Sequence, residues 1–132
     1  MSRRRSRPED QIQRAVFQHL AVRAAPGVVA FHVPTGGYRS PTEAKIFKSL
    51  GVKPGVSDVL AIKPTDCPHC GYGPLPMVYA LELKAEGGRT SEAQLAFIAG
   101  INEAGGVGAV AVGLDRAIAC LEAWRLLRGR VS

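Results

Sequence analysis

The chain has 132 residues, of which 46% are hydrophobic and 21% are charged, a composition typical of one globular domain with a buried core. No apolar run approaches the roughly 20 residues of a membrane span, and no signal-peptide core follows the arginine-rich start, so a cytoplasmic protein is expected. The net charge of +6, from 17 basic and 11 acidic residues, favours a polyanionic partner. We expect a basic tail over residues 1–7, one domain over 8–128 and a short tail over 129–132.

The first third of the chain predicts a helix, a strand and a short helix. Pro8 suits the first turn of a helix whose apolar residues recur at helical spacing up to about Arg23. The β-branched and aromatic run 28–33 predicts a strand, and residues 42–50 predict a short helix closed by Gly51. His32 lies in the apolar strand, where a hydrogen-bonded structural histidine is more usual than a catalytic one.

Two neighbouring strands are predicted over residues 57–63 and 77–84, where apolar residues alternate with others. Asp58 stands at the start of the first strand, after a Pro54-Gly55 turn. Side chains two apart on a strand share a face, so Glu82 and Lys84 lie on one face, while Tyr79, Leu81 and Leu83 share the other and can face a core. We therefore expect Asp58 and Glu82 to meet across the sheet.

This arrangement of two carboxylates and a lysine predicts a metal site. Adjacent carboxylates repel each other unless a cation lies between them, and oxygen ligands suit Mg²⁺ or Mn²⁺. Such an ion, held by Asp58 and Glu82, would support phosphodiester hydrolysis, with Lys84 stabilising the attacking water and the phosphate. A lone Glu-x-Lys is usually the solvated face of a strand, and the upstream aspartate is what favours a site here.

The last third predicts a helix over 91–104, a strand over 107–112 and a helix over 115–127. Ser91 and Gln94 have capping-box spacing, so Gln94 either closes the helix start or reaches the site, and the two roles are compatible. The loop over 87–89 either approaches a phosphate or is a plain turn. The alternation of helices and strands predicts an α/β fold with a mixed sheet flanked by helices.

An insertion between the two site strands, residues 64–76, contains Cys67-x-x-Cys70. This is half the ligand set of a zinc site, because tetrahedral zinc needs four ligands. Cys120 lies in a helical pattern where burial is expected. Three interpretations stay open: a hairpin tip without metal, a zinc site completed across a dimer, and a site within one chain aided by Asp66 and His69. A disulfide is not expected.

The chain resembles the VRR-NUC family, a branch of the restriction-endonuclease-like PD-(D/E)xK nucleases, in two segments, FHVPTGGYRSPTEAKIFKSLGVKPGVSDVLAI and LELKAEGGRTSEAQ. The resemblance covers about residues 9–112. It implies a restriction-endonuclease-like core of α-β-β-β-α-β order, with Asp58, Glu82 and Lys84 as motif residues. It also implies Gln94 as the glutamine on the next helix and Glu9 as the acidic residue of the first helix. The aspartate here follows Val-Ser instead of proline.

The resemblance implies Mg²⁺- or Mn²⁺-dependent cleavage of DNA, often branched DNA. Small members resemble dimeric Holliday-junction resolvases and are frequently phage-associated, so a homodimer in a bacterial cytoplasm is expected. Two alternatives stay open: a nuclease acting on linear duplex, and a non-catalytic nucleic-acid-binding module on the same fold. The residues expected to contact DNA are basic or aromatic and lie in the N-terminal tail, around the short helix and in the loop after Lys84: Arg3, Arg4, Arg5, Tyr38, Arg39, Lys45, Lys48 and Arg89.

Overall fold

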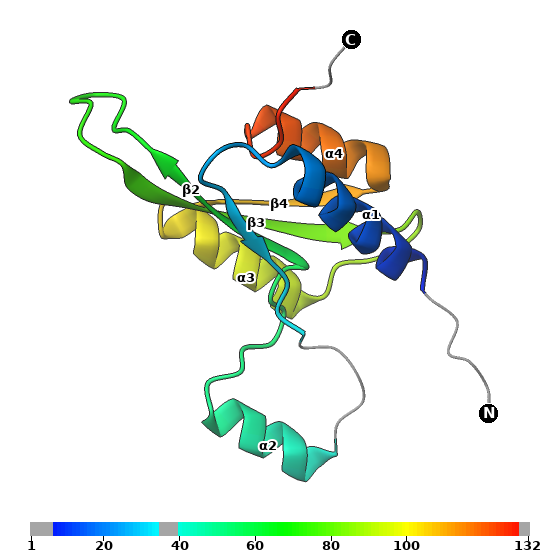
Figure 1. Ribbon diagram of the computed structural model, residues 1–132. Helices are drawn as coiled ribbons and strands as arrows, with labels where there is room; N and C mark the ends of the chain where they lie inside the picture. The colour runs from blue at the N-terminus through cyan, green and yellow to red at the C-terminus, as the bar shows by residue number, and fades with distance from the viewer. Residues whose placement is uncertain (1–6, 35–39, 130–132) are drawn as a thin grey trace.

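A computed structural model describes residues 7–34 and 40–129 of the chain (Figure 1). Its elements in chain order are α1 (Pro8–Arg23), β1 (Val29–Phe31), α2 (Pro41–Ser49), β2 (Val59–Thr65), β3 (Leu75–Lys84), α3 (Glu92–Glu103), β4 (Val107–Val112) and α4 (Leu114–Ala123). This is the predicted order of helices and strands. Five of the residues expected to contact DNA lie outside the described residues: Arg3, Arg4, Arg5, Tyr38 and Arg39.

The four strands form one mixed sheet in the order β1-β2-β3-β4. β1 and β2 are antiparallel, as are β2 and β3, whereas β4 lies parallel to β3. The parallel pair requires a crossover, and α3 supplies it. Helices α1 and α4 cover one face of the sheet and α3 covers the other (Figure 1). The protein therefore has the α/β architecture with a mixed sheet that the sequence predicted.

The hydrophobic core lies between the sheet and the α1–α4 layer. Leu81 and Leu83 of β3 are fully buried on this side, and the ring of Tyr79 packs on that of Trp124 with centroids 5.4 Å apart. Burying a leucine side chain contributes about 2 kcal/mol, so this face anchors β3 firmly. The opposite face of the same strand carries Glu82 and Lys84, which points these two side chains toward the α3 side of the sheet.

Two predicted boundaries were wrong. The helix predicted over 115–127 ends at Ala123, after which Arg125 adopts a φ of 59°. Leu126 and Leu127 are still buried, because the chain turns back so that Leu127 pairs with Ala24 after α1. The β2–β3 hairpin is longer than predicted: Pro64 and Thr65 pair with Pro76 and Leu75, so the insertion is reduced to the loop over residues 66–74.

Helix α2 stands away from the rest of the fold (Figure 1). None of its residues, all of which the structure describes, is buried. Ser40 caps its first turn by accepting a hydrogen bond from the Glu43 backbone N–H at 3.2 Å. Two apolar side chains in and after this helix are more than half exposed, Ile46 at 53% and Leu50 at 73%. In the part of the chain that the structure describes, no helix has the length and apolar character needed to cross a membrane.

Candidate active site

Asp58 and Glu82 come together where β2 begins beside β3. Val59 pairs with Leu81, so Asp58 immediately precedes the paired region and faces the strand that carries Glu82. The Asp58 carboxylate accepts a hydrogen bond at 2.8 Å from the backbone N–H of Leu83. This bond holds the Asp58 side chain against β3, between the positions of Glu82 and Lys84. The predicted meeting of the two carboxylates across the sheet is present.

Glu82 is an almost completely buried carboxylate, with 2% of its surface exposed. One oxygen, Oε1, accepts a hydrogen bond at 2.8 Å from the Gln94 side-chain amide and lies 3.7 Å from the Lys84 Nζ. The other oxygen, Oε2, is buried and has no hydrogen-bond partner in the described part of the chain. A buried carboxylate oxygen without a donor is costly, and it is the kind of atom that a cation would satisfy.

The surroundings of Glu82 disfavour its charge. Burial is the largest cause and the neighbouring Asp58 charge is the next, and together they raise the pKa of Glu82 from 4.5 to about 8. Lys84 opposes this rise, and Glu9 adds to it with a smaller effect. Three carboxylates thus lie in one region that a single lysine only partly compensates. A divalent cation would reverse the balance and hold Glu82 ionised.

Gln94 both caps the start of α3 and contacts Glu82. Its side-chain oxygen accepts from the backbone N–H of Ser91 at 2.8 Å, and its backbone N–H donates to the Ser91 hydroxyl at 3.1 Å. This reciprocal pair is a capping box at the start of α3. The amide nitrogen of the same side chain points the other way and binds Glu82. The cap therefore fixes the amide that positions the buried carboxylate.

The turn before Asp58 explains why α3 begins at the site. Gly55 has a φ of +80°, and a Cβ placed on it would overlap the backbone carbonyl of Ala93 and lie 2.7 Å from the Gln94 nitrogen. Only glycine fits this contact comfortably, since it combines a left-handed backbone with close packing. The Pro54-Gly55 turn thus brings the start of β2 and the start of α3 together, and with them Asp58 and Gln94.

Glu9 reaches the same region from α1. A Cβ on Gly88 would lie 3.1 Å from the Glu9 Oε1 and 3.5 Å from the Lys84 Cδ, so the three residues are close neighbours. The glycine loop after β3 therefore gives room for the Glu9 carboxylate and the Lys84 side chain to approach. Arg89, expected to contact DNA, lies exposed in this loop.

Sequence reasoning missed how two residues are placed around Asp58. His32 follows β1 and is exposed, and its Nδ1 hydrogen-bonds the Asp58 backbone oxygen at 2.8 Å. It is thus a hydrogen-bonded histidine, as expected, and it lies beside the site. Ser57 is completely buried, and its hydroxyl has no hydrogen-bond partner among the described residues. The pairing of β1 with β2 is what brings His32 beside Asp58.

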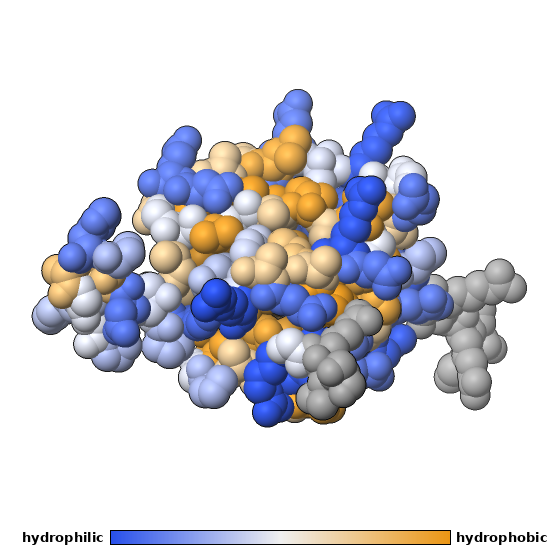
Figure 2. All heavy atoms as spheres, turned by 90° about the horizontal axis from the view of Figure 1, so that it is seen from above, coloured by the Kyte–Doolittle hydropathy of each residue, from blue (hydrophilic) through white to orange (hydrophobic). Residues whose placement is uncertain are grey.

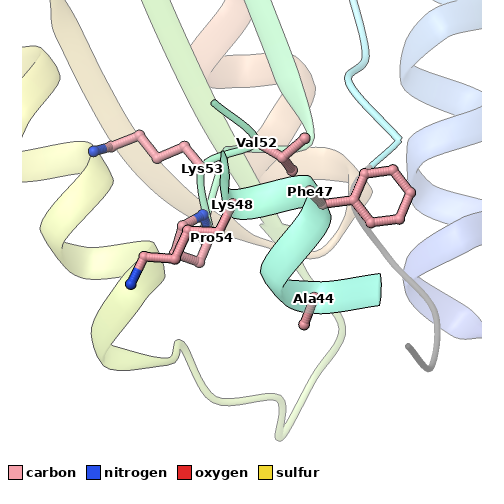
Figure 3. Close-up of a pocket in the computed structure, with 7 residues that line it drawn as sticks. Ala44, Phe47, Lys48, Val52, Lys53 and Pro54 are labelled. Atoms are coloured by element: carbon pink, nitrogen blue, oxygen red, sulfur yellow. The ribbon is translucent and has the colours of Figure 1, made fainter. Parts of the chain in front are cut away.

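A basic hollow lies next to the turn that leads to Asp58. It has a volume of about 400 Å³ and is lined by Ala44, Phe47, Lys48, Val52, Lys53, Pro54 and Gly55. Figure 3 shows the Lys48 and Lys53 side chains extending to the same side of this hollow. Lys45, on the same helix as Lys48, is also exposed. Lys53 was not among the residues expected to contact DNA, although its place in the chain, just before the Pro-Gly turn, puts it near the site.

The donors at the site suit Mg²⁺ or Mn²⁺. Within residues 7–34 and 40–129, no group of three His, Cys, Asp or Glu side chains is placed to hold one ion. Two carboxylates, Asp58 and Glu82, are nevertheless the usual protein contribution to a magnesium site, because this cation retains several of its waters. The Glu82 Oε2, which has no hydrogen-bond partner among residues 7–34 and 40–129, is an available ligand atom. The residues present therefore fit a hard divalent cation.

The fold matches that of a solved structure described as "VRR_NUC domain protein". The match has a TM-score of 0.66 and 22% sequence identity, and it covers 94% of this chain and 93% of that one. No family model matches the sequence. The comparison with curated proteins also produced no match. The structural likeness confirms the fold that the resemblance implied, over nearly the whole of both chains.

Proposed function

We propose that the protein is an endonuclease that hydrolyses phosphodiester bonds of DNA with Mg²⁺ or Mn²⁺. The observation that carries the proposal is the cluster around Glu82: a second carboxylate, a lysine and an orienting amide meet there, and one buried oxygen lacks a partner among the described residues. The match in fold with a VRR_NUC domain protein supports this interpretation.

Each residue of the cluster has a distinct part in this proposal. Asp58 and Glu82 would hold the cation. When bound, the cation supplies a Lewis acid that lowers the pKa of water and offsets phosphate charge. Lys84 carries its positive charge to the point where an attacking water and a phosphate oxygen would meet, and its ammonium donates hydrogen bonds to both. Gln94 positions Glu82, and Glu9 tunes the local charge from α1.

We infer that the preferred substrate is branched DNA, cut by a homodimer. The basic side chains on α2 and the following turn lie outside the sheet, on an element that stands away from the fold (Figure 1). These basic side chains are placed to bind phosphates of a second DNA arm, outside the duplex segment that reaches Asp58 and Glu82. Paired symmetric nicks in a four-way junction need two sites related by a two-fold axis, hence a dimer.

The test compares wild-type protein with Asp58→Asn and Lys84→Met on four-way junction, flap, fork and linear duplex DNA. Mg²⁺, Mn²⁺ or EDTA is present in parallel reactions. The control is Glu103→Gln, which removes an exposed carboxylate at the end of α3. We expect both site variants to lose cleavage by at least about 100-fold, as when one charge-stabilising group is removed from an active site. The control should cut like the wild type.

Binding and mass measurements separate the alternatives. Cleavage of junctions before linear duplex, by a protein that sediments as a dimer, supports the full proposal. Faster cleavage of linear duplex retains the nuclease and overturns the branched substrate. Metal-independent binding without any cleavage would reduce the domain to a nucleic-acid-binding module.

A further inference from the structure

The tip of the β2–β3 hairpin is a folded knuckle that the nuclease site does not use. The Cys67 backbone N–H donates to the Tyr72 oxygen at 2.9 Å, and the Gly71 N–H donates to the Cys67 oxygen at 2.8 Å. Gly71 has a φ of 71°, which lets the chain reverse immediately after Cys70. Gly73 packs directly on the Asp66 side chain. These contacts close the loop over residues 66–74 into one compact turn.

The knuckle presents two free thiols, Cys67 and Cys70, on one compact turn. All three cysteines of the chain are unpaired, and Cys70 is exposed while Cys67 is half-buried. The hydrogen bond from the Gly71 N–H to the Cys67 oxygen at 2.8 Å folds the segment that holds both cysteines into one turn. A Cys-x-x-Cys pair with this spacing is half of a tetrahedral zinc site.

One chain does not complete the site. In residues 7–34 and 40–129, no third His, Cys, Asp or Glu is placed with the two thiols to hold an ion. Cys120 packs against the hydrophobic core on α4, which lies well apart from the tip (Figure 1). The two missing ligands must come from outside the described part of the chain.

The shape of the hairpin favours a second copy as their source. β1 pairs with β2 only as far as Ile62, and β4 pairs with β3 only from Tyr79, so the outer part of the hairpin is a two-stranded ribbon. It forms the lobe at the left of Figure 2, clear of the main body. A ribbon of two strands is only marginally stable alone, and a contact at its tip would stabilise it.

The side chains of the tip also favour self-association. Tyr72 is 72% exposed and Leu75 is 41% exposed, so the ribbon offers apolar surface for a partner to cover. Within residues 64–76 the only acidic or basic side chain besides His69 is Asp66, whereas the whole chain carries +6. Two tips can therefore approach without the repulsion that two basic bodies would experience.

We propose that Cys67 and Cys70 from two copies of the chain bind one zinc ion in a Cys₄ site that joins the hairpin tips. The cation replaces the four thiol protons, which pass to solvent, so no oxidant or reductant is needed. The site is separate from the nuclease cluster and does not depend on nuclease activity. It explains why a compact Cys-x-x-Cys knuckle stands at the end of a projecting ribbon.

The test titrates the full, reduced, metal-free chain with Zn²⁺ and separately with Co²⁺, without DNA. We expect a thiolate-to-cobalt charge-transfer band that saturates at one ion per two chains, intense tetrahedral visible bands, and no monomer in sedimentation of the zinc-loaded sample. The double variant Cys67→Ser, Cys70→Ser should lose all three signals. Cys120→Ser, which removes the third thiol, should retain them. Asp58→Asn should also retain them, which distinguishes this site from the nuclease metal.

Three results would overturn the proposal. The first is the absence of stoichiometric zinc binding by the reduced wild type. The second is one ion per chain on a monomer, which would assign the remaining ligands to the same chain. The third is a sulfur charge-transfer band that is absent from the cobalt-loaded wild type or that survives the double variant; cobalt bound by the Asp58 and Glu82 carboxylates gives no such band and does not count. None of these results bears on DNA cleavage, and loss of cleavage in Asp58→Asn has no bearing on the zinc stoichiometry.

Discussion

Replacement of Glu82 by glutamine should stabilise the metal-free protein at alkaline pH. The pKa of Glu82 is about 8 in the fold, against an ordinary value of 4.5, so over this interval the folded state keeps a proton that the unfolded chain has lost. Stability therefore falls as pH rises. There is no penalty below the unfolded value of 4.5, and the penalty is complete above about 8.

The size of this loss of stability follows from the change in the free energy of unfolding per pH unit. One pKa unit corresponds to about 1.4 kcal/mol, so ionising Glu82 between about pH 6 and about pH 9 should cost the wild type about 2–3 kcal/mol. For a domain of this size that is a fall in Tm of about 10 °C. The amide introduced by Glu82→Gln cannot ionise and can still accept a hydrogen bond from Gln94, so this variant should lack that component of the fall.

The assay is thermal unfolding with EDTA across that pH range, for wild type, Glu82→Gln and the control Glu103→Gln, whose carboxylate is exposed. The Tm of the variant minus that of the wild type should grow with pH, and the control should follow the wild type. Mg²⁺ or Mn²⁺ should raise the wild-type Tm most at high pH, because it keeps Glu82 ionised without penalty. Parallel curves for wild type and Glu82→Gln would refute the reasoning.

Three further variants test the orientation of Glu82, the packing of the turn before Asp58 and the contact of α2 with DNA. Gln94→Ala should lower kcat by about 10-fold or more with KM little changed. Ser91→Ala loses the hydroxyl half of the cap at a cost of about 1 kcal/mol but keeps the backbone N–H that binds the Gln94 side-chain oxygen, so this variant should cut normally. Equal loss of kcat in both variants would assign Gln94 to capping alone. Gly55→Ala should lower the free energy of unfolding by at least about 2 kcal/mol, because the new Cβ overlaps the Ala93 backbone and the residue keeps a strained φ. Denaturant unfolding measures this change, and an unchanged midpoint would contradict the contact. Lys48→Glu should weaken DNA binding, measured by fluorescence anisotropy, and should reduce by about 1 the slope of log affinity against log salt concentration. The control Arg116→Glu on α4 should leave this slope unchanged. Equal effects of the two variants would show that only the net charge of the protein matters.

The meeting of Asp58 and Glu82 was predictable because it depends on local rules. Strand alternation fixes which side chains share a face, and the antiparallel pairing of two neighbouring strands is the commonest arrangement of adjacent strands. The capping box was predictable for the same reason, since its partners lie three residues apart. What the sequence left open was the second use of Gln94, because that depends on α3 packing against the sheet through Gly55.

The end of α4 shows why local periodicity fails at boundaries. Leu126 and Leu127 continue the apolar spacing of the helix, and that spacing predicts a helix extending to Leu127. In the structure the same two side chains are buried by a chain reversal at Arg125 and a bridge to Ala24. Arg23 adds a hydrogen bond at 2.6 Å to the Arg128 oxygen. These partners lie about a hundred residues away in the chain and have no signature in the local pattern.

The burial of Glu82 and Lys84 depends on tertiary structure, whereas the face of β3 that they share depends on the sequence alone. Alternation alone predicts that charged residues on a strand face solvent, yet these two are only 2% and 6% exposed. They are buried because β3 lies inside the sheet, with α3 on their side and the hydrophobic core on the other. Burial of Leu81 and Leu83 offsets the cost of holding a carboxylate cluster in place. Glu82→Gln removes the cost of a buried carboxylate and therefore stabilises the protein without its cation. The same substitution removes a ligand of that cation.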